Sequence, residues 1–236
     1  FRQALNYGFD RSATVNAVNP GYKAYNRLVD SNFAGPGGGK FVDEYPVETA
    51  PLSGDVDQAK EYLAAAMEEL GYSDVSQLPQ LELITWDTSE QKLLLKTIID
   101  QWKQNLGLEN IQLTQYVIGT AIGSFYDLSY DLFSITWETD VLPTDIMEAM
   151  VTGGEVNYGI WSDAQFDALV EQAINELDPD KQAELTAQAE QIFLDNEAIL
   201  PLYENGVTGA VQSYVEGFQM SATSSGYQFN NLVVHK

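Results

Sequence analysis

From residue 55 onward, helix-like stretches that end in glycine alternate with short apolar runs, and this alternation constrains the fold more than any other feature. Residues 59–71 and 95–107 carry apolar side chains at the spacing of one helix face, and each stretch closes on a glycine. Residues 81–86 and 111–117 have strand-like sequences. Because alternating helices and strands pack as layers, we predict an α/β fold with a mixed sheet flanked by helices.

The starts of the predicted helices carry recognisable caps. Thr88 with Gln91 resembles a capping box, a Ser/Thr followed three residues later by Glu/Gln. Ser162 with Gln165 has the same spacing. Pro179 opens the last long helix, at the position where its missing N–H is not needed. Three further segments are predicted as strands: residues 131–137, 199–203 and 227–234.

The first 54 residues are less regular. Residues 1–18 look helical, with a possible break at residues 10–12, and residues 19–54 look irregular. The glycine-rich stretch 35–39 precedes Lys40 and invites comparison with a phosphate-binding loop. The comparison fails because Ala34 replaces the first glycine of that motif and Phe41 replaces the residue that would hold magnesium.

The charge balance limits the partners. The chain has 236 residues, a net charge of −24 and only 11 basic residues, so we expect no nucleic-acid partner and no attraction to acidic membranes. No apolar run approaches the roughly 20 residues of a membrane helix. Residues 104–180 contain no Lys or Arg. The acidity favours solubility in a crowded or salty exterior, with attraction of cationic solutes as the second interpretation.

Cysteine and histidine usage excludes several chemistries. The chain has no cysteine, which rules out disulfides and thiol catalysis within it. Its one histidine is His235, an unlikely place for a catalytic triad or a histidine-rich metal site. An EF-hand calcium loop does not occur either, and we expect neither a metal nor a cofactor.

The acidic residues after the predicted strand 131–137 allow two interpretations. Glu138 and Asp140 form a pair of the type that glycoside hydrolases use, although many carboxylate pairs arise by chance in so acidic a chain. In a binding role, Asp140 would accept charge-assisted hydrogen bonds from an ammonium group. The strand edge from Thr136 through Trp137 to Glu138 would then pair with an extended ligand. Trp86, at another strand end, would supply an apolar wall, unless it and Trp137 serve only in core packing.

Short motifs follow one another along nearly the whole chain. The first is residues 1–11, with Arg-x-Ala followed by Asp-Arg. The others are residues 57–63, 71–72, 130–132, 137–140, 157–161, 166–169, 198–203 and 231–234. In this order they resemble the family 5 solute-binding proteins, the oligopeptide- and dipeptide-binding components of ABC importers.

This resemblance implies a lobe of the periplasmic-binding-protein type 2 kind. Family members have two lobes that close around a ligand. The resemblance implies that residues 1–204 are the second, C-terminal lobe, that residues 205–236 return to the first lobe, and that this N-terminal lobe is absent from the chain. It also implies an extracytoplasmic location, periplasmic or as a surface lipoprotein anchored through that absent part. The expected partners are a small peptide or similar solute and the importer's permease subunits, and we expect a monomer and no enzymatic activity.

The resemblance also implies a binding site. The family's Trp-x-x-Asp motif lies at the cleft, and in peptide binders its aspartate holds the ligand's α-amino group. Trp137 and Asp140 occupy these positions. We therefore expect the following residues to contact the ligand: Trp86, Thr136, Trp137, Glu138, Thr139, Asp140, Asn157 and Tyr158.

Two departures from the family pattern leave the ligand open. The family often continues the motif with a tyrosine, and this chain has Val141 there, with Pro143 one residue early. Some peptide binders place arginines on the preceding strand, where this chain has Ser134. These departures leave the peptide length undefined and keep other family ligands open, such as oligosaccharides or metal chelates. An oligosaccharide stacked on Trp86, Trp137 or Trp161 is the alternative ligand, and an acid-pair glycoside hydrolase is the separate alternative outside the binding class.

Overall fold

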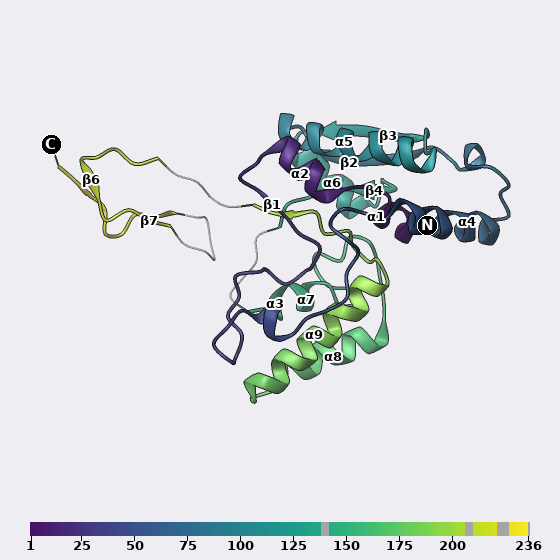
Figure 1. Cartoon of the computed structure of the whole chain (residues 1–236). Helices are drawn as coiled ribbons and strands as arrows, with labels where there is room; N and C mark the ends of the chain where they lie inside the picture. Colours follow the sequence, from purple (N-terminus) through teal and green to yellow (C-terminus); the bar gives the residue numbers. More distant parts are fainter. Residues whose placement is uncertain (138–141, 206–209, 221–226, 236) are drawn as a thin grey trace.

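The computed structural model describes residues 1–137, 142–205, 210–220 and 227–235. Its main part has an upper body, built on a three-stranded sheet with helices on both sides, and a lower body of helices (Figure 1). A thin β-ribbon made from the last residues projects away from both bodies (Figure 1). The architecture confirms the predicted α/β class.

The three-stranded sheet has the order β3-β2-β4, and both pairings are parallel. Helix α5 connects β2 to β3, and α6 connects β3 to β4 on the opposite side of β2. Antiparallel pairings are found in separate two-stranded ladders elsewhere in the chain. The bounds are β2 Leu81–Trp86, α5 Ser89–Leu106, β3 Ile111–Tyr116, α6 Ile118–Asp127 and β4 Leu132–Phe133.

Alternate residues of β2 enter two different cores. Leu83 packs with α5 and α4 in the larger core, whereas its neighbour Ile84 is fully buried on the other face with Ala121 and Phe125 of α6. This follows from the two-residue period of a strand, which sends successive side chains to opposite faces. Because both faces are covered, β2 carries apolar side chains toward each face, at Leu83 and Ile84.

Helix ends in the upper body follow the predicted signals. Gly71 and Gly107 both have positive φ, 72° in each case, and close α4 and α5. Thr88 caps α5 by accepting the backbone N–H of Gln91, as predicted. Asp10 caps α2 after the predicted break. The helices here are α1 Arg2–Tyr7, α2 Arg11–Val18, α4 Val56–Leu70 and the 3-10 turn η1 Val75–Gln77.

The lower body packs α8 and α9 against α3 and α7 around Phe166, Phe193 and Phe41. Pro179 opens α9 as predicted. The cap predicted for α8 at Ser162 is wrong, because Asp163 accepts the N–H groups of residues 165 and 166. A carboxylate one residue later offers the stronger acceptor. The bounds are α3 Phe41–Glu44, α7 Asp145–Ala149, α8 Ala164–Asn175 and α9 Pro179–Asp195.

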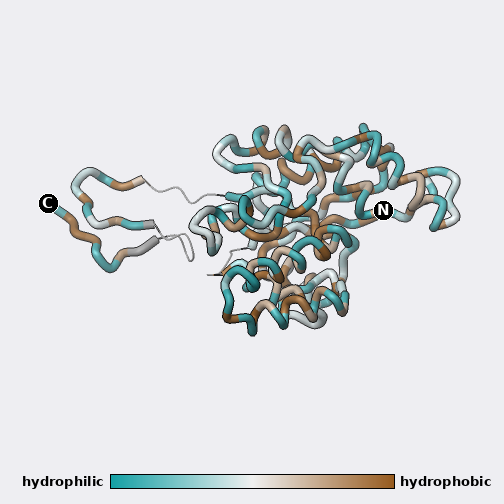
Figure 2. Tube along the Cα trace, turned by 60° about the horizontal axis from the view of Figure 1, so that its bottom comes forward, coloured by the Kyte–Doolittle hydropathy of each residue, from teal (hydrophilic) through white to brown (hydrophobic). Residues whose placement is uncertain are grey.

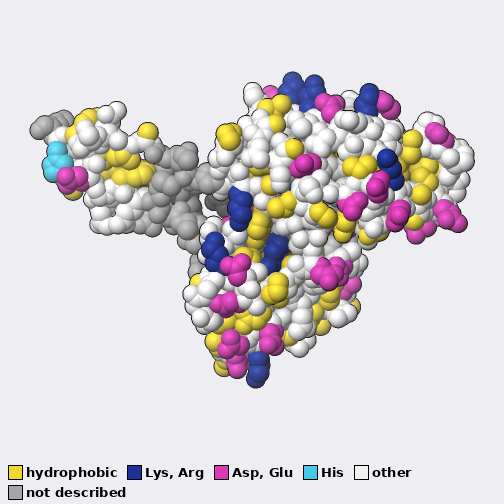
Figure 3. Space-filling view, viewed as in Figure 1, with side chains coloured by type: hydrophobic (Ala, Val, Ile, Leu, Met, Phe, Trp, Pro, Cys, Tyr) yellow, Lys and Arg dark blue, Asp and Glu magenta, His cyan; other side chains and the backbone are white. Residues whose placement is uncertain are grey.

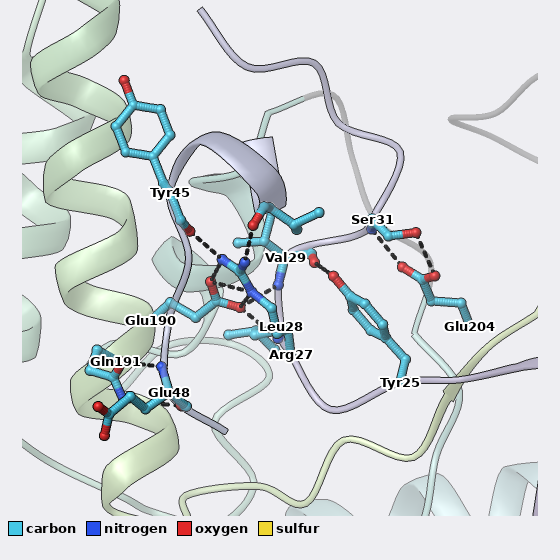
Figure 4. Close-up of polar contacts among 11 residues, drawn as sticks. Tyr25, Arg27, Leu28, Val29, Ser31, Tyr45, Glu48, Glu190, Gln191 and Glu204 are labelled. Carbon is cyan, nitrogen blue, oxygen red and sulfur yellow. Dashed lines mark hydrogen bonds and ion pairs between the residues drawn. The ribbon is translucent and has the colours of Figure 1, made fainter. Parts of the chain in front are cut away.

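A buried ion pair fixes the irregular segment 19–54 to α9. Glu190 is fully buried and accepts hydrogen bonds from the Arg27 guanidinium and from the backbone N–H groups of Leu28 and Val29 (Figure 4). Arg27 also donates to the carbonyls of Val42 and Tyr45. The pair therefore supplies hydrogen-bond partners to backbone N–H and carbonyl groups of a segment that has little regular secondary structure.

The glycine-rich loop is filled by a carboxylate of the chain itself. Glu44 of α3 accepts the N–H groups of Gly37 at 2.8 Å and Gly39 at 2.6 Å. A Cβ atom on Gly35 would lie 2.2 Å from a Glu44 carboxylate oxygen, so the glycine permits this close approach. The loop has the anion-binding character of a backbone nest, and Glu44 supplies the anion.

Three predicted strands are shorter than expected. Of residues 131–137, only Leu132 and Phe133 join the ladder, and the next carbonyl, that of Ser134, accepts a hydrogen bond from the Thr85 hydroxyl. Of residues 199–203, only Tyr203 joins a ladder: β5 Tyr203–Glu204 pairs with β1 Lys23–Ala24. Pro201 has no N–H to donate to a ladder.

Residues 227–234 form two short strands rather than one, separated by a turn in which the N–H of Leu232 bonds to the carbonyl of Phe229. The ribbon consists of β6 Val215–Glu216 paired with β9 Val233–Val234, and β7 Gln219–Met220 paired with β8 Tyr227–Gln228. Its described strands pair only with one another. Its role as a segment that returns to another lobe stays a prediction.

The surface carries the charge pattern expected from composition. Acidic side chains are spread over both bodies of the face in Figure 3. The hydropathy trace in Figure 2 alternates along the helices instead of forming long apolar stretches. Among the described residues, no helix is both long enough and apolar enough to cross a membrane.

Candidate ligand-binding site

The carboxyl ends of the three parallel strands meet at one edge of the sheet. Trp86 at the end of β2 pairs in register with Tyr116 at the end of β3, and Phe133 of β4 pairs with Ile84. The residues that follow these strands, including residues 135–137, therefore start from the same edge. Crevices outside this edge are the usual ligand sites of open α/β sheets.

Two predicted contact residues leave this edge toward solvent. Thr136 is exposed, and the Trp137 side chain is 45% exposed. An indole left half open to water at the carboxyl edge is available for a ligand rather than committed to the core. Glu138, Thr139 and Asp140, the other predicted residues of this segment, lie outside the described residues.

Trp86 and Tyr158 flank the same buried ring. Trp86 meets Phe125 edge to face at 6.3 Å between ring centroids, and Tyr158 lies 5.4 Å from Phe125 on a tilted plane. Phe133 of β4 completes the contact at 5.0 Å. The predicted residues Trp86 and Tyr158 thus belong to one aromatic cluster under α6, and both remain only partly buried.

The loop that carries Asn157 and Tyr158 is held by its own hydrogen bonds. The Asn157 amide donates to the carbonyls of Val151 and Trp161 and accepts the Trp161 N–H. Both donor hydrogens of the amide are therefore used, and only acceptor capacity on Oδ1 remains for a ligand. A ligand role for Asn157 stays a prediction, and its observed task is to shape the loop.

Sequence reasoning missed an apolar stripe on α6. Ile118 and Ile122, four residues apart on one helix face, are 61% and 39% exposed, and Tyr126 continues the stripe at 68%. Helix α6 begins immediately after β3, so Ile118 lies at the carboxyl edge of the sheet. The sequence signal for this stripe is the i, i+4, i+8 spacing of Ile118, Ile122 and Tyr126.

Gln91 links two segments next to this edge. Its amide oxygen accepts from the Ser134 hydroxyl, and its amide nitrogen donates to the Tyr203 hydroxyl, each at 3.4 Å. Tyr203 stacks on Tyr22, with ring centroids 5.0 Å apart. Burial raises the pKa of Tyr203, so its hydroxyl stays protonated and can donate at neutral pH.

The described residues contain no group of three His, Asp or Glu side chains arranged to hold a metal ion. The half-open indole, the exposed isoleucines and the nearby backbone suit an organic ligand with apolar parts and an extended backbone.

Sequence comparison finds a matching family model and several relatives. Residues 1–158 match the family model described as bacterial extracellular solute-binding proteins, family 5, middle region. The oligopeptide-binding protein OppA of Bacillus subtilis is 28% identical over 233 residues, which cover 96% of this chain and 41% of that protein. The probable deoxycholate-binding periplasmic protein YgiS of Escherichia coli is 28% identical over 176 residues, covering 72% of this chain and 31% of that protein.

Solved structures show the same fold. A substrate-binding domain of an oligopeptide ABC transporter from Bacillus anthracis superposes with a TM-score of 0.84 at 23% identity, covering all of this chain and 45% of that one. Listeria monocytogenes OppA bound to peptide gives a TM-score of 0.81 at 22% identity, covering all of this chain and 44% of that one. The chain thus spans less than half the length of each of these four proteins.

Proposed function

This chain belongs to the family 5 bacterial extracellular solute-binding proteins, and we propose that it forms one wall of a cleft that binds peptides or similar amine-bearing solutes for an ABC importer. The observation that carries the proposal is the convergence of Trp86, Ile118 and the half-exposed Trp137 at the carboxyl edge of the parallel sheet. The relatives named for oligopeptides and dipeptides support a peptide as the ligand.

We propose Asp140 as the anchor for the ligand's ammonium group. It follows the exposed Trp137 by three residues and belongs to the segment 104–180, which contains no Lys or Arg. A carboxylate can accept a charge-assisted hydrogen bond from an amine. The backbone of residues 136–139 would then pair with the extended ligand, with Trp137 against its first side chains.

The role is binding rather than catalysis, and its setting is extracytoplasmic. The family consists of extracellular solute-binding proteins, which supports a location outside the cytoplasm. Anchoring as a lipoprotein, delivery to permease subunits and a monomeric state belong to the same proposal. Residues 205–236 are proposed to pack on the other lobe, which would cover the apolar residues that the ribbon exposes.

An oligosaccharide remains the second candidate ligand, with less support. Trp161 lies against Phe166 and Phe193 in the lower core, at 4.9 and 5.1 Å between ring centroids, so it is committed to packing. Trp137 remains as an exposed stacking surface.

Native mass spectrometry of the full-length protein, followed by calorimetry with synthetic peptides and oligosaccharides, tests the proposal. We expect peptides to co-purify and to bind with saturation. Saturable binding of oligosaccharides with no response to any peptide would overturn it, as would turnover of a glycoside that is lost in Glu138→Gln.

A further inference from the structure

A polar cavity lies between the upper and lower bodies, away from the aromatic cluster of the candidate site. Its volume is about 340 Å³, within the range of small-ligand sites. Its walls come from α1, α2, α4 and the end of α9, and they include Asn6, Tyr7, Arg11, Tyr62 and Glu197. The proposed transport function uses none of these residues.

Glu197 is buried in this wall with a single hydrogen bond. The residue is only 6% exposed, and Oε2 accepts a hydrogen bond from the Asn6 amide. Among the described contacts, Oε1 has no hydrogen-bond partner and Glu197 has no ion-pair partner within 4.0 Å. A buried carboxylate with one hydrogen bond and no counter-charge has lost hydration that these contacts do not replace, so it favours a cation beside it.

The nearest guanidinium does not pair directly with Glu197. Arg11 donates to the carbonyls of Pro201 and Asn6 and to the Asn6 side chain, and its guanidinium lies over the Phe9 ring at 4.5 Å. Asn6 therefore stands between the two charges, accepting from Arg11 and donating to Glu197. With its donors directed to these acceptors, Arg11 is poorly placed to receive an anion.

Glu197 has a backbone conformation that is unusual for a glutamate. Its φ is +48°, the left-handed conformation in which helix ends favour glycine or asparagine. It follows α9, where the N–H of residue 197 bonds to the carbonyl of Leu194. A glutamate held in a disfavoured conformation with its carboxylate in a cavity is the kind of outlier that motivates a functional hypothesis.

The remaining wall suits a positively charged organic group. Tyr7 and Tyr62 form an edge-to-face pair at 5.3 Å, which offers aromatic surface of the kind that attracts cations. Glu48 and Asp195 add two exposed carboxylates at the cavity. No trio of acidic or histidine side chains suited to a metal occurs in the described ranges, which favours an organic cation over a metal ion.

We propose that this cavity binds a small organic cation through its primary ammonium group, with Glu197 as the anchor. The ammonium donates to the free oxygen of Glu197, and the aliphatic part lies against Tyr7 and Tyr62. The site is separate from the cleft, so it stands whether or not the transport proposal holds.

The test is an NMR titration of the full chain with butylamine, with 1-butanol as the neutral control of the same size. The Asn6 side-chain amide reports on the cavity, and the Trp137 indole reports on the cleft. We expect butylamine, but not butanol, to shift the Asn6 amide with saturation. The affinity rises with pH as Glu197 loses its proton. The charged or titratable groups facing Glu197 are the Phe1 amino group, Arg2, Tyr7, Arg11, Glu48, Tyr62 and Asp195.

Two variants sharpen the test. Glu197→Gln keeps an acceptor for the Asn6 amide but removes the negative charge. We expect this variant to weaken butylamine binding at least tenfold. Glu48→Gln weakens butylamine binding by a smaller factor and serves if Glu197→Gln does not fold, whereas Glu171→Gln, at an exposed and remote position on α8, leaves it unchanged. Equal shifts with butanol, a shift of the Trp137 indole alone, or the same affinity in Glu197→Gln and Glu48→Gln as in the unmodified chain would overturn the proposal.

Discussion

The hydroxyl of Tyr130 donates a 2.6 Å hydrogen bond to the backbone carbonyl of Tyr158. This bond connects the residue preceding Asp131 and β4 with the loop that carries Asn157 and Tyr158, two of the predicted contact residues. Both rings also pack on Phe125, so the hydrogen bond and the aromatic contacts fix the loop together.

We expect Tyr130→Phe to lower the free energy of unfolding by about 1–3 kcal/mol, because it leaves a partly buried carbonyl without its donor. Urea denaturation measures this. Tyr116→Phe is the matched control, since the Tyr116 hydroxyl has no hydrogen bond among the described contacts and its ring lies in the same cluster. Equal losses in the two variants would contradict the role of the Tyr130 hydroxyl.

The buried Arg27–Glu190 ion pair predicts a larger loss of stability. Glu190→Gln should destabilise the chain by about 3–5 kcal/mol, because it leaves a buried guanidinium without its counter-charge. The segment around residues 27–45 should lose hydrogen-exchange protection first. Lys103→Met, which breaks the exposed pair with Glu109, is the control and should change little. A small effect of Glu190→Gln would show that this segment is held by other contacts.

The apolar stripe on α6 predicts ligand preference rather than stability. Ile118→Ser and Ile122→Ser should each weaken binding of peptides with apolar side chains by about 1 kcal/mol while leaving the thermal midpoint nearly unchanged, because both side chains are exposed in the free chain. Ile174→Ser, at another exposed isoleucine on α8, should leave affinity unaltered. Calorimetry on the full-length protein separates these outcomes, and an unchanged affinity in the α6 variants would remove the stripe from the site.

The buried Glu197 predicts an unusual pH dependence. Burial raises its pKa to about 7, against the opposing effects of Asn6 and Arg11. The folded chain therefore holds this proton between the ordinary value of 4.5 and pH 7, where the unfolded chain has released it. The free energy of unfolding should fall as pH rises through this window, by on the order of 3 kcal/mol, and then level off.

Glu197→Gln should remove this slope, and urea unfolding between pH 4.5 and 8 measures it. Glu184→Gln on the exposed side of α9 is the control and should keep the slope of the unmodified chain. The same slope in Glu197→Gln would assign it to other groups.

The sequence predicted the elements whose signals are local. Gly71 and Gly107 mark helix ends by a conformation that glycine adopts readily, and β2 stands out as a short apolar run between them. Strand lengths depended on tertiary contacts instead. The ladder of β4 ends at Phe133, and no local pattern in residues 131–137 reveals the bond that the next carbonyl accepts from Thr85, 49 positions away.

The candidate site could be predicted only in outline. Parallel strands bring their carboxyl ends to one edge, which places Trp86 and the segment leading to Trp137 there, and their contact with a ligand stays a prediction. The structure leaves Asn157 as a prediction only, because the hydrogen bonds that occupy its amide are formed within a loop whose shape the sequence does not specify.

The central claim is that Asp140 receives a ligand's ammonium group. The most direct measurement compares a peptide with its N-acetylated form on the full-length protein and on Asp140→Asn. The account predicts that acetylation weakens binding to the unmodified protein by about 2–5 kcal/mol and has little further effect on the variant. The same loss on acetylation in both proteins would contradict it.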